Sequence, residues 1–376
     1  MKKTWILIFV IMAAGLVFGP TVTHAFLEKR INRPQTNSNI PVVENPKQPL
    51  YGEFEFELEE VLSIGKEDDI DYVFSSINNL SVDSLGKIYV SDARARRVQV
   101  FDKDGQYLMT LGRAGQGPGE FVICRLLGIS PEGDIYVSSG IRRVEVFQKD
   151  GSYKRTIAVN FSLRNLQFNS EGTPFGLIQY VEEEKGYLRE FVKLNPTFQI
   201  EKSLFKAPYT LSTFMEGGAN ITVSTGYEHG LLIGKRPQGF FVGNSAEYTI
   251  YLLNEEGDKE LKIKKDGPPR KIPASKRKRS GKIPLPDYQP FFYRFHSDNL
   301  GRIYAETENP NFTEEKTIAD VFGPDGHYLY QIKLPHRTYI IDDGYLYCVE
   351  MNEERGLFLM KRYLITNWSS MKIKAE

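Results

Sequence analysis

The sequence has few of the residues from which disulfide-rich and metal-binding domains are built. It contains two cysteines and five histidines in 376 residues. Two cysteines exclude a framework of several disulfides and a cysteine-based metal site. Cys124 and Cys348 both lie in apolar, strand-like segments, so we predict two buried free thiols. No His-Glu-x-x-His motif and no acidic calcium loop is present, and the histidines are not paired at the spacing of zinc ligands.

The chain also has no excess charge of either sign. Its 48 basic residues match its 48 acidic residues, for a formal net charge of zero. Removing the first 25 residues would take away two lysines and leave the rest slightly acidic. A chain with this balance has no overall attraction to nucleic acid or to anionic lipid, so we expect no nucleic-acid partner.

Long hydrophobic runs are absent except at the N-terminus. Two lysines precede an apolar run from Trp5 to Phe18, and Thr23 and Ala25 supply small residues for cleavage. This pattern is typical of a secretory signal peptide over residues 1–25, and the run is short for a membrane span. An uncleaved anchor is the alternative. In both cases we expect export to the periplasm or outside the cell, with membrane contact only through this segment.

One short stretch is rich in glycine: GRAGQGPGEF, from Gly112 to Phe121. A Walker loop needs Lys followed by Ser or Thr after its last glycine, whereas Glu120 follows here. A dinucleotide-binding fingerprint must open a helix, but the next residues, FVICRLLGISPEGDIYV, continue as strand, turn and strand. The stretch therefore predicts a sharp connector between two pieces of sheet. No Gly-x-Ser-x-Gly motif indicates a serine nucleophile, and we assign no catalytic residue.

What the sequence does contain is an internal repeat. LSVDSLGKIYVSD (Leu80 to Asp92) is echoed by LGISPEGDIYVSS (Leu127 to Ser139), and RRVQVFDKDGQYLMTLG is echoed by RRVEVFQKDGSYKRTIA. Each unit turns first at a glycine and then at Asp-Gly or Glu-Gly, which predicts four strands, a to d. Six such units, with almost no helical periodicity, predict an all-β, six-bladed β-propeller over residues 53–366.

The last unit lacks a fourth strand, because the chain ends soon after LFLMKRYLIT. The segment Glu53 to Gly65 has the pattern of a strand d with no a, b or c strand before it. We predict that it pairs with the last blade and closes the ring, which removes the exposed edges of an open array. Residues 26–52, with several Pro and Asn, are predicted as a linker, and residues 367–376 as a C-terminal tail. Deleting residues 26–50 is expected to leave stability nearly unchanged.

The repeat resembles that of the NHL-repeat type of six-bladed propeller, within a broad group of exported bacterial propeller proteins. The residues that carry the resemblance are the GKIYVSD and RRVQVFDKDG unit, the GRAGQGPGEF connector and the LPDYQPFF stretch before the fifth blade. It covers about residues 53–366. The resemblance implies the fold and leaves the activity open, because many functions occur on this scaffold.

A basic insertion, about residues 264–290, separates the fourth and fifth units. Lys and Arg dominate its charged residues, in KKDGPPRKIPASKRKRSGKIP from Lys264 to Pro284. We predict a solvated insertion between blades, as in the proteins that the repeat resembles. A patch for a polyanionic surface is the alternative.

Propeller geometry indicates where a ligand would bind. In a four-stranded blade the a–b and c–d turns lie on one face of the ring, and the b–c loops and d–a connectors lie on the other. The second face carries arginines in blades one and two and acidic residues in blades three, five and six. We expect a ligand or partner to bind there, at the channel mouth, with solvated loops as the alternative. The candidate residues are Arg94, Arg96, Arg113, Glu120, Arg142, His296, Glu306, Glu308 and Glu350.

These observations predict a binding or interaction module that is monomeric and has no cofactor. We expect its partner to be a protein or peptide in preference to a small ligand. The alternative is a metal-dependent lactonase or lyase, because gluconolactonase-like and paraoxonase-like hydrolases on similar propellers hold a divalent ion over the channel. Calcium or zinc would then bind Glu306, Glu308 and Glu350. The fixed carboxylate and asparagine constellation of those families is absent from the sequence.

Overall fold

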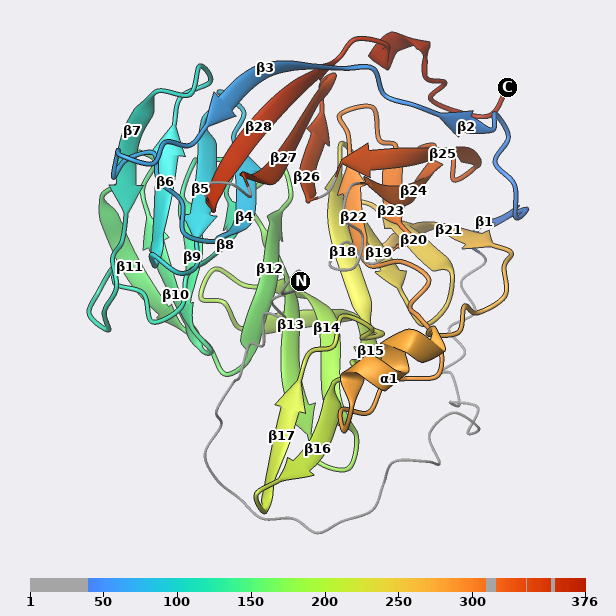
Figure 1. The fold of residues 1–376 in the computed structure, drawn as a ribbon, viewed down its shortest axis with the longest axis horizontal. Helices are drawn as coiled ribbons and strands as arrows, with labels where there is room; N and C mark the ends of the chain where they lie inside the picture. The colour runs from blue at the N-terminus through green and yellow to red at the C-terminus, as the bar shows by residue number, and fades with distance from the viewer. Residues whose placement is uncertain (1–39, 309–315, 336, 353–355) are drawn as a thin grey trace.

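A computed structural model describes residues 40–308, 316–335, 337–352 and 356–376. Six blade sheets, each with four antiparallel strands from the repeat, surround a central axis, and their innermost strands lie nearest the centre of the ring (Figure 1). The protein is therefore an all-β, six-bladed β-propeller, as predicted. The predicted signal peptide, residues 1–25, lies outside the described residues. Within the described part, no helix is long and apolar enough to cross a membrane.

The first three blades follow the chain from the centre of the ring outward. Blade one consists of β4 (Ile77–Val82), β5 (Ile88–Asp92), β6 (Arg97–Phe101) and β7 (Tyr107–Leu111). Blade two consists of β8 (Arg125–Ile129), β9 (Ile135–Gly140), β10 (Arg143–Phe147) and β11 (Tyr153–Ala158). Blade three consists of β12 (Ser162–Phe168), β13 (Pro174–Glu182), β14 (Gly186–Leu194) and β15 (Ile200–Pro208).

The last three blades each take an additional strand from the N-terminal part of the chain. Blade four is built on β18 (Leu231–Arg236), β19 (Gly239–Asn244), β20 (Thr249–Leu253) and β21 (Lys259–Lys265). Blade five is built on β22 (Arg294–Ser297), β23 (Ile303–Glu306), β24 (Lys316–Phe322) and β25 (Tyr328–Pro335). Blade six is built on β26 (Thr338–Asp342), β27 (Tyr345–Asn352) and β28 (Leu357–Ile365).

Two sequence features explain these strands: glycines at the tight turns, and apolar residues that alternate along each strand. Gly105 closes the c–d turn of blade one at φ +82°, and Gly151 closes that of blade two at φ +88°. Glycine adopts this left-handed conformation without steric cost. Apolar side chains of neighbouring blades pack between the sheets: Val98 of blade one and Leu126 of blade two are fully buried in one cluster. The core therefore lies between blades, so each blade depends on its neighbours.

The N-terminal strand closes the ring, as predicted. β3 (Leu58–Ile64) pairs antiparallel with β28 and forms the outer strand of blade six. The three inner strands of this blade come from the end of the chain. Blade six therefore joins both ends of the described chain in one sheet, and the outer edge of β28 is covered.

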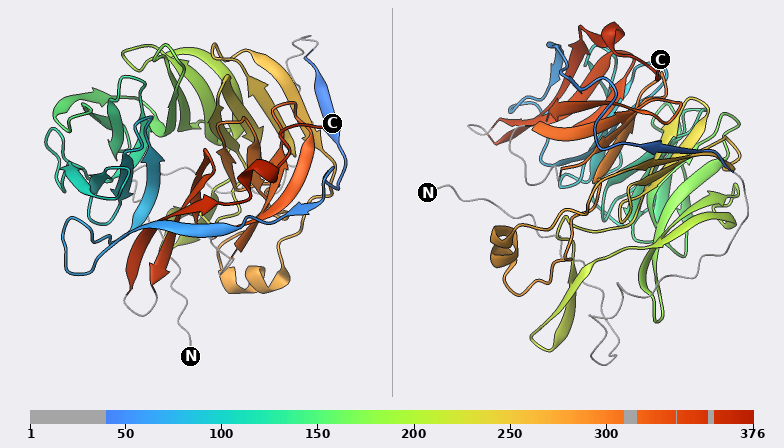
Figure 2. Two further views of the ribbon diagram at one scale, coloured as in Figure 1. Left: turned by 90° about the horizontal axis from the view of Figure 1, so that it is seen from above. Right: turned by 90° about the vertical axis from the view of Figure 1, so that its right-hand side faces the viewer.

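The residues before β3 also pair with the ring. β1 (Val42–Asn45) is parallel to β21 of blade four, and β2 (Glu53–Phe54) is parallel to β25 of blade five. We call residues 41–64 the N-terminal strap, because they run along the outside of blades four, five and six (Figure 2, left). The segment predicted as a linker, residues 26–52, thus contains strand near its end. The free outer edges of two blades explain the difference, since they offer hydrogen-bonding partners to an extended chain.

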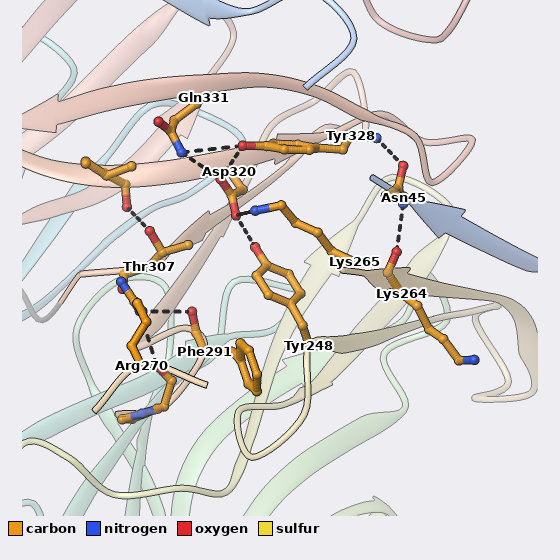
Figure 3. A network of polar contacts seen from close by, with 12 residues as sticks. Asn45, Tyr248, Lys264, Lys265, Arg270, Phe291, Thr307, Asp320, Tyr328 and Gln331 are labelled. Atoms are coloured by element: carbon orange, nitrogen blue, oxygen red, sulfur yellow. Dashed lines mark hydrogen bonds and ion pairs between the residues drawn. The ribbon is translucent and has the colours of Figure 1, made fainter. Parts of the chain in front are cut away.

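Asn45 fixes the strap to two blades. It is 3% exposed. Its amide group donates to the carbonyl oxygens of Lys264 (3.1 Å) and Gly326 (2.9 Å), and its side-chain oxygen accepts from the backbone N–H of Tyr328 (2.7 Å) (Figure 3). Every polar atom of this buried side chain is therefore satisfied by blade four or blade five.

The segment predicted as a C-terminal tail packs against blade five. Residues Trp368–Ser370 form a short 3-10 helix, and Met371 is 4% exposed. The backbone N–H of Lys372 donates to the hydroxyl group of Tyr330 (3.0 Å). These contacts extend the folded unit beyond residue 366.

Two long d–a connectors project from one side of the ring (Figures 1 and 2). The first joins blades three and four and contains the hairpin β16 (Ser212–Glu216) and β17 (Ala219–Val223). The second, residues 266–293, joins blades four and five and contains α1 (Ala274–Ser280). As d–a connectors, both lie on the face that the sequence marks as the binding face.

The two connectors hold one another. The hydroxyl group of Ser212 donates to the carbonyl oxygen of Pro284 (2.5 Å), and a ring nitrogen of His229 lies 3.2 Å from the carbonyl oxygen of Tyr288. Ile272 is 4% exposed. The basic insertion therefore has packed residues as well as solvated ones, and its first two lysines belong to β21.

The glycine-rich stretch is a tightly packed connector between blades one and two. Gly112 has φ +69°, and a Cβ there would lie 2.2 Å from the ring of Phe121. The carboxylate of Glu120 accepts from the backbone N–H of Gly117 (2.8 Å), and Arg143 donates to the carbonyl oxygen of Gly117 (2.5 Å). The stretch thus uses glycine for close packing and a sharp turn.

Replacing Gly112 with Ala tests this role. The new methyl group would be strained at positive φ and would push Phe121 out of the core between blades, so we expect a larger stability loss than for Gly186→Ala. Gly186 also has a positive φ, +75°, but a Cβ there meets nothing within 4 Å. The difference should be roughly 1–3 kcal/mol in urea unfolding, the usual cost of overpacking. Equal losses would show that Phe121 is not pressed against this glycine.

Candidate functional site

The six inner strands enclose a cavity of about 650 Å³ at the centre of the ring. Its walls combine apolar residues with side-chain amides, chiefly Asn78, Asn79, Asn165 and Gln167. A volume of this size lies within the range of pockets that bind small molecules. The channel of this propeller is therefore a pocket with polar walls.

The charge of the wall has one sign. Five cationic residues and one histidine line the cavity, and no Asp or Glu is among the described lining residues. The set is Arg125, Arg164, Arg189, Lys235, Arg294 and His296. The chain as a whole is neutral, so this wall concentrates positive charge that is balanced elsewhere on the molecule.

All four arginines lie toward the face of b–c loops and d–a connectors. Arg294, the first residue of β22, donates to the carbonyl oxygen of Thr338 (3.0 Å). Every inner strand starts at a d–a connector, and Arg125 is the first residue of β8 while Arg164 is near the start of β12. Arg189 is near the start of β14, just after a b–c turn. We call Arg125, Arg164 and Arg189 the arginine cluster. It lies at the end of the cavity nearest the two long connectors.

Burial and mutual repulsion act on the arginine cluster. The pKa of Arg164 falls to about 9, first through burial and then through the charges of Arg125 and Arg189. Burial and the charge of Arg189 lower the pKa of Arg125. Burial also lowers the pKa of Arg189, against the opposite effects of Tyr209 and Glu228. The three guanidinium groups are thus close enough to disfavour one another's charge.

No carboxylate neutralises the cluster within the described residues. Arg189 donates to the carbonyl oxygen of Leu231 (3.2 Å), and its guanidinium group stacks 3.6 Å from the ring centre of Tyr209. Glu228 is near enough to affect the pKa of Arg189, but its carboxylate accepts from Thr225 and Gly226. In the part of the chain that the structure describes, none of the three arginines forms an ion pair within 4.0 Å.

His296 and Glu306 form a buried pair beside the cavity. Nε2 of His296 lies 2.5 Å from the carboxylate of Glu306, and Nδ1 lies 3.2 Å from the carbonyl oxygen of Tyr339. Burial raises the pKa of Glu306, but Arg294 and His296 outweigh it, and the pKa falls below its usual value. Both ring nitrogens of His296 therefore lie within hydrogen-bond distance of an acceptor oxygen, one in blade five and one in blade six. His296 lines the cavity, so this pair lies at the cavity wall.

The other predicted site residues lie on the rim or away from the channel. Arg94, Arg96 and Arg142 are exposed in b–c turns of blades one and two. Arg113 is paired with Glu120 (2.9 Å) in the glycine-rich connector, and the bonds from Gly117 and Arg113 lower the pKa of that carboxylate. These five residues lie on the predicted face, but none of them lines the cavity.

The three predicted metal ligands do not converge. Glu306 is bound by His296, whereas Glu350 accepts from the hydroxyl group of Tyr363 (2.7 Å) and pairs with Lys361 (2.9 Å) in blade six. Glu308 is partly exposed beyond β23. Among the described residues, no group of three His, Cys, Asp or Glu could hold a metal ion.

Sequence reasoning missed the arginine cluster. The rim arginines occur in visible loop motifs, whereas Arg125 and Arg164 occur inside strand-like runs, FVICRLLGI and FSLRNLQF. The missed signal is their position in strand a of each blade. Strand a is the strand next to the channel, so a charged residue in it has the cavity within reach. Arg189 comes from a third strand, and only the folded blade brings it beside the other two.

Comparisons with known proteins identify the fold. A family model, DUF5128, described as "6-bladed beta-propeller", matches residues 60–230, less than half of the chain. A Bacteroides fragilis protein described as "Putative exported protein" is similar with a TM-score of 0.57 and 12% identity, over 86% of this chain and 99% of that chain. At this identity the likeness shows the six-bladed fold alone. No curated protein matches the sequence, and the NHL type of repeat stays a resemblance.

Two enzymes have lower structural scores. Virginiamycin B lyase from Staphylococcus aureus has a TM-score of 0.46 and 11% identity, over 82% of this chain and 100% of that chain. A gluconolactonase from Xanthomonas campestris has a TM-score of 0.45 and 14% identity, over 78% of this chain and 88% of that chain. Scores this low carry no argument about the chemistry of this chain.

Proposed function

We propose that this protein is an exported binding module that takes a small ligand into the central cavity of the propeller. The ligand enters from the face of b–c loops and d–a connectors. The observation that carries the proposal is the cavity of about 650 Å³ with polar walls and with the arginine cluster at one end. The three arginines are half-buried and have no ion pair among the described residues. Unpaired cationic groups are costly to desolvate, and binding sites are where proteins retain them.

The proposed compartment rests on the N-terminal sequence. The lysines, the apolar run and the small residues before residue 26 are typical of a signal peptide. The two cysteines are buried and free, so they provide no evidence for or against an oxidising compartment. We propose the periplasm or the cell exterior as the place where the ligand is met.

A protein or peptide partner on the rim is the second possibility. Arg94, Arg96 and Arg142 are exposed on the same face and would meet acidic side chains of such a partner. A small ligand is favoured because the cavity of about 650 Å³ has the size of a small-molecule pocket and none of these three arginines lines it. In this case the rim arginines lie at the entrance of the cavity and do not contact the bound ligand.

The metal-dependent lactonase or lyase is supported less well by the charges. A divalent cation over the channel would meet the five cations of the cavity wall. Glu306 and Glu350 already bind His296 and Lys361 in two different blades, so neither carboxylate is free to approach the other. Cation repulsion of this kind disfavours a calcium or zinc site at the channel mouth.

A cavity-filling variant tests the proposal. Asn165 lines the cavity, so Asn165→Trp should occupy the space and abolish capture of small molecules from the native extracytoplasmic fraction, read by mass spectrometry of the purified protein. The matched control is the triple rim variant Arg94→Glu, Arg96→Glu and Arg142→Glu, which should still retain the captured compound. Loss of capture in the rim variant with full retention in Asn165→Trp would overturn the cavity as the binding site.

A further inference from the structure

The geometry points to the class of ligand: a small organic molecule that carries two or more negative charges on carboxylate or phosphate groups, held by the arginine cluster. This inference rests on the proposed function and adds the chemistry of the ligand to it. Arg125, Arg164 and Arg189 would contact the anionic groups, and the amide side chains of the cavity wall would contact the rest of the molecule.

The first reason to infer an anionic ligand is the unpaired positive charge of the arginine cluster. The arginine cluster comes from three strands in two blades, β8, β12 and β14, and it has no ion pair in the described chain. The guanidinium groups of Arg125 and Arg164 have no hydrogen-bond partner among the described residues either. Elsewhere the protein pairs its buried cations well: Lys265 lies 2.7 Å from Asp320, and Arg302 lies 2.6 Å from Asp298. Other half-buried arginines without an ion pair, such as Arg97 and Arg294, donate to backbone carbonyl oxygens. The guanidinium groups of Arg125 and Arg164 are therefore exceptions among the described residues.

The chemistry of guanidinium is the second reason. Each guanidinium group offers donors in a planar fork that matches a carboxylate or a phosphate. One oxyanion engages one or two such forks, so three arginines match a ligand with more than one negative charge. The stacking of Arg189 on Tyr209, 3.6 Å from the ring centre, holds one fork in place before a ligand arrives.

The shape of the cavity is the third reason. Beyond the arginine cluster the wall carries four side-chain amides. Asn78 and Asn79 donate to backbone carbonyl oxygens of blade two, at 2.8 and 2.6 Å, so Asn165 and Gln167 are the amides that we expect to contact the ligand. Such amides suit the hydroxyl or carbonyl groups of a small metabolite better than a lipid tail. A long polyanion would leave these residues unused, so we infer a compact ligand that fits inside the ring.

The test is a thermal unfolding series with three probes: citrate, glucose 6-phosphate and glucose. We expect citrate or glucose 6-phosphate, but not glucose, to raise Tm by about 5 °C near 100 times its Kd. Arg164→Gln should lower affinity for that anion about tenfold or more, because a charge-assisted hydrogen bond is lost. The matched control, Arg142→Gln, removes an exposed arginine of the same face and should keep the affinity of the parent protein. Which of the two anions binds better separates a carboxylate ligand from a phosphate ligand.

A second readout separates binding from a structural role. Without ligand, Arg164→Gln should raise Tm, since it removes repulsion from Arg125 and Arg189. A lower Tm without ligand would show that Arg164 supports the fold and would overturn the inference. The inference also fails if neither anion shifts Tm, or if Arg164→Gln keeps the full shift. In that event, a compound captured by the parent protein and lost in Asn165→Trp would leave the proposed function standing with a ligand of another class.

Discussion

A chain that begins at residue 66 will fail to fold into a soluble monomer, whereas a chain that begins at residue 40 will fold. The difference is the N-terminal strap. Its last strand, β3, covers the edge of β28 with pairs from Leu58 to Ile64. Without it, blade six keeps three strands and exposes an unpaired edge, which is a template for aggregation. Size-exclusion chromatography of the two chains gives the result directly.

A third chain, which begins at residue 51, isolates the first part of the strap. It lacks β1 and Asn45, so the three side-chain hydrogen bonds of Asn45 and the backbone pairing of β1 with β21 are lost. We expect it to fold but to unfold at lower denaturant, by about 1–3 kcal/mol for the buried groups left unpaired. The sequence alone predicted almost no effect for this truncation. Equal stability of the chains that begin at residues 40 and 51 would restore that prediction and contradict the role of Asn45.

Replacing Asp320 with Asn will cost the fold about 3–5 kcal/mol. Asp320 is fully buried in blade five. Its carboxylate accepts from the hydroxyl groups of Tyr248 (2.5 Å) and Tyr328 (2.6 Å) and pairs with Lys265 (2.7 Å) (Figure 3). The pKa of Tyr248 lies well above its usual value, mainly because the residue is buried and also because Asp320 is near. The hydroxyl group of Tyr248 therefore keeps its proton and donates it to the hydrogen bond with Asp320. The substitution would leave Lys265 charged and unpaired between blades four and five.

Two further variants make the measurement specific. Asp104→Asn removes a carboxylate from an exposed pair with Lys103 and should change stability by about 0.5 kcal/mol or less. Adding Lys265→Met to Asp320→Asn should recover part of the loss, because the unpaired charge is removed. If Asp320→Asn unfolds at the same urea concentration as Asp104→Asn, this buried group does not hold the two blades together.

The fold was predictable because the sequence pattern of each strand and turn is local and recurs in each blade. Alternating residues and glycine turns such as Gly105 and Gly151 recur in each blade, and each recurrence confirms the others. Even ring closure followed from one unpaired strand pattern near Glu53. The strap was not predictable in the same way, because Val42–Asn45 is a short, isolated strand whose partner, β21, is more than 200 residues away in the chain.

The site was only partly predictable, for a different physical reason. The residues predicted from the sequence include His296, which lines the cavity. The sequence does not mark the arginine cluster, since Arg125, Arg164 and Arg189 belong to three strands whose distances depend on how blades two and three pack. Exposed loop arginines such as Arg94 look more functional in a sequence than buried ones, although burial is what makes an unpaired charge informative.

The most direct measurement of the central claim is a crystal structure of the protein with the anion that raises Tm the most. We expect the anion to lie inside the central cavity, with its oxygen atoms within hydrogen-bond distance of Arg125, Arg164 and Arg189. An anion bound on the rim, beside Arg94 or Arg142, with only solvent at the arginine cluster, would contradict the claim.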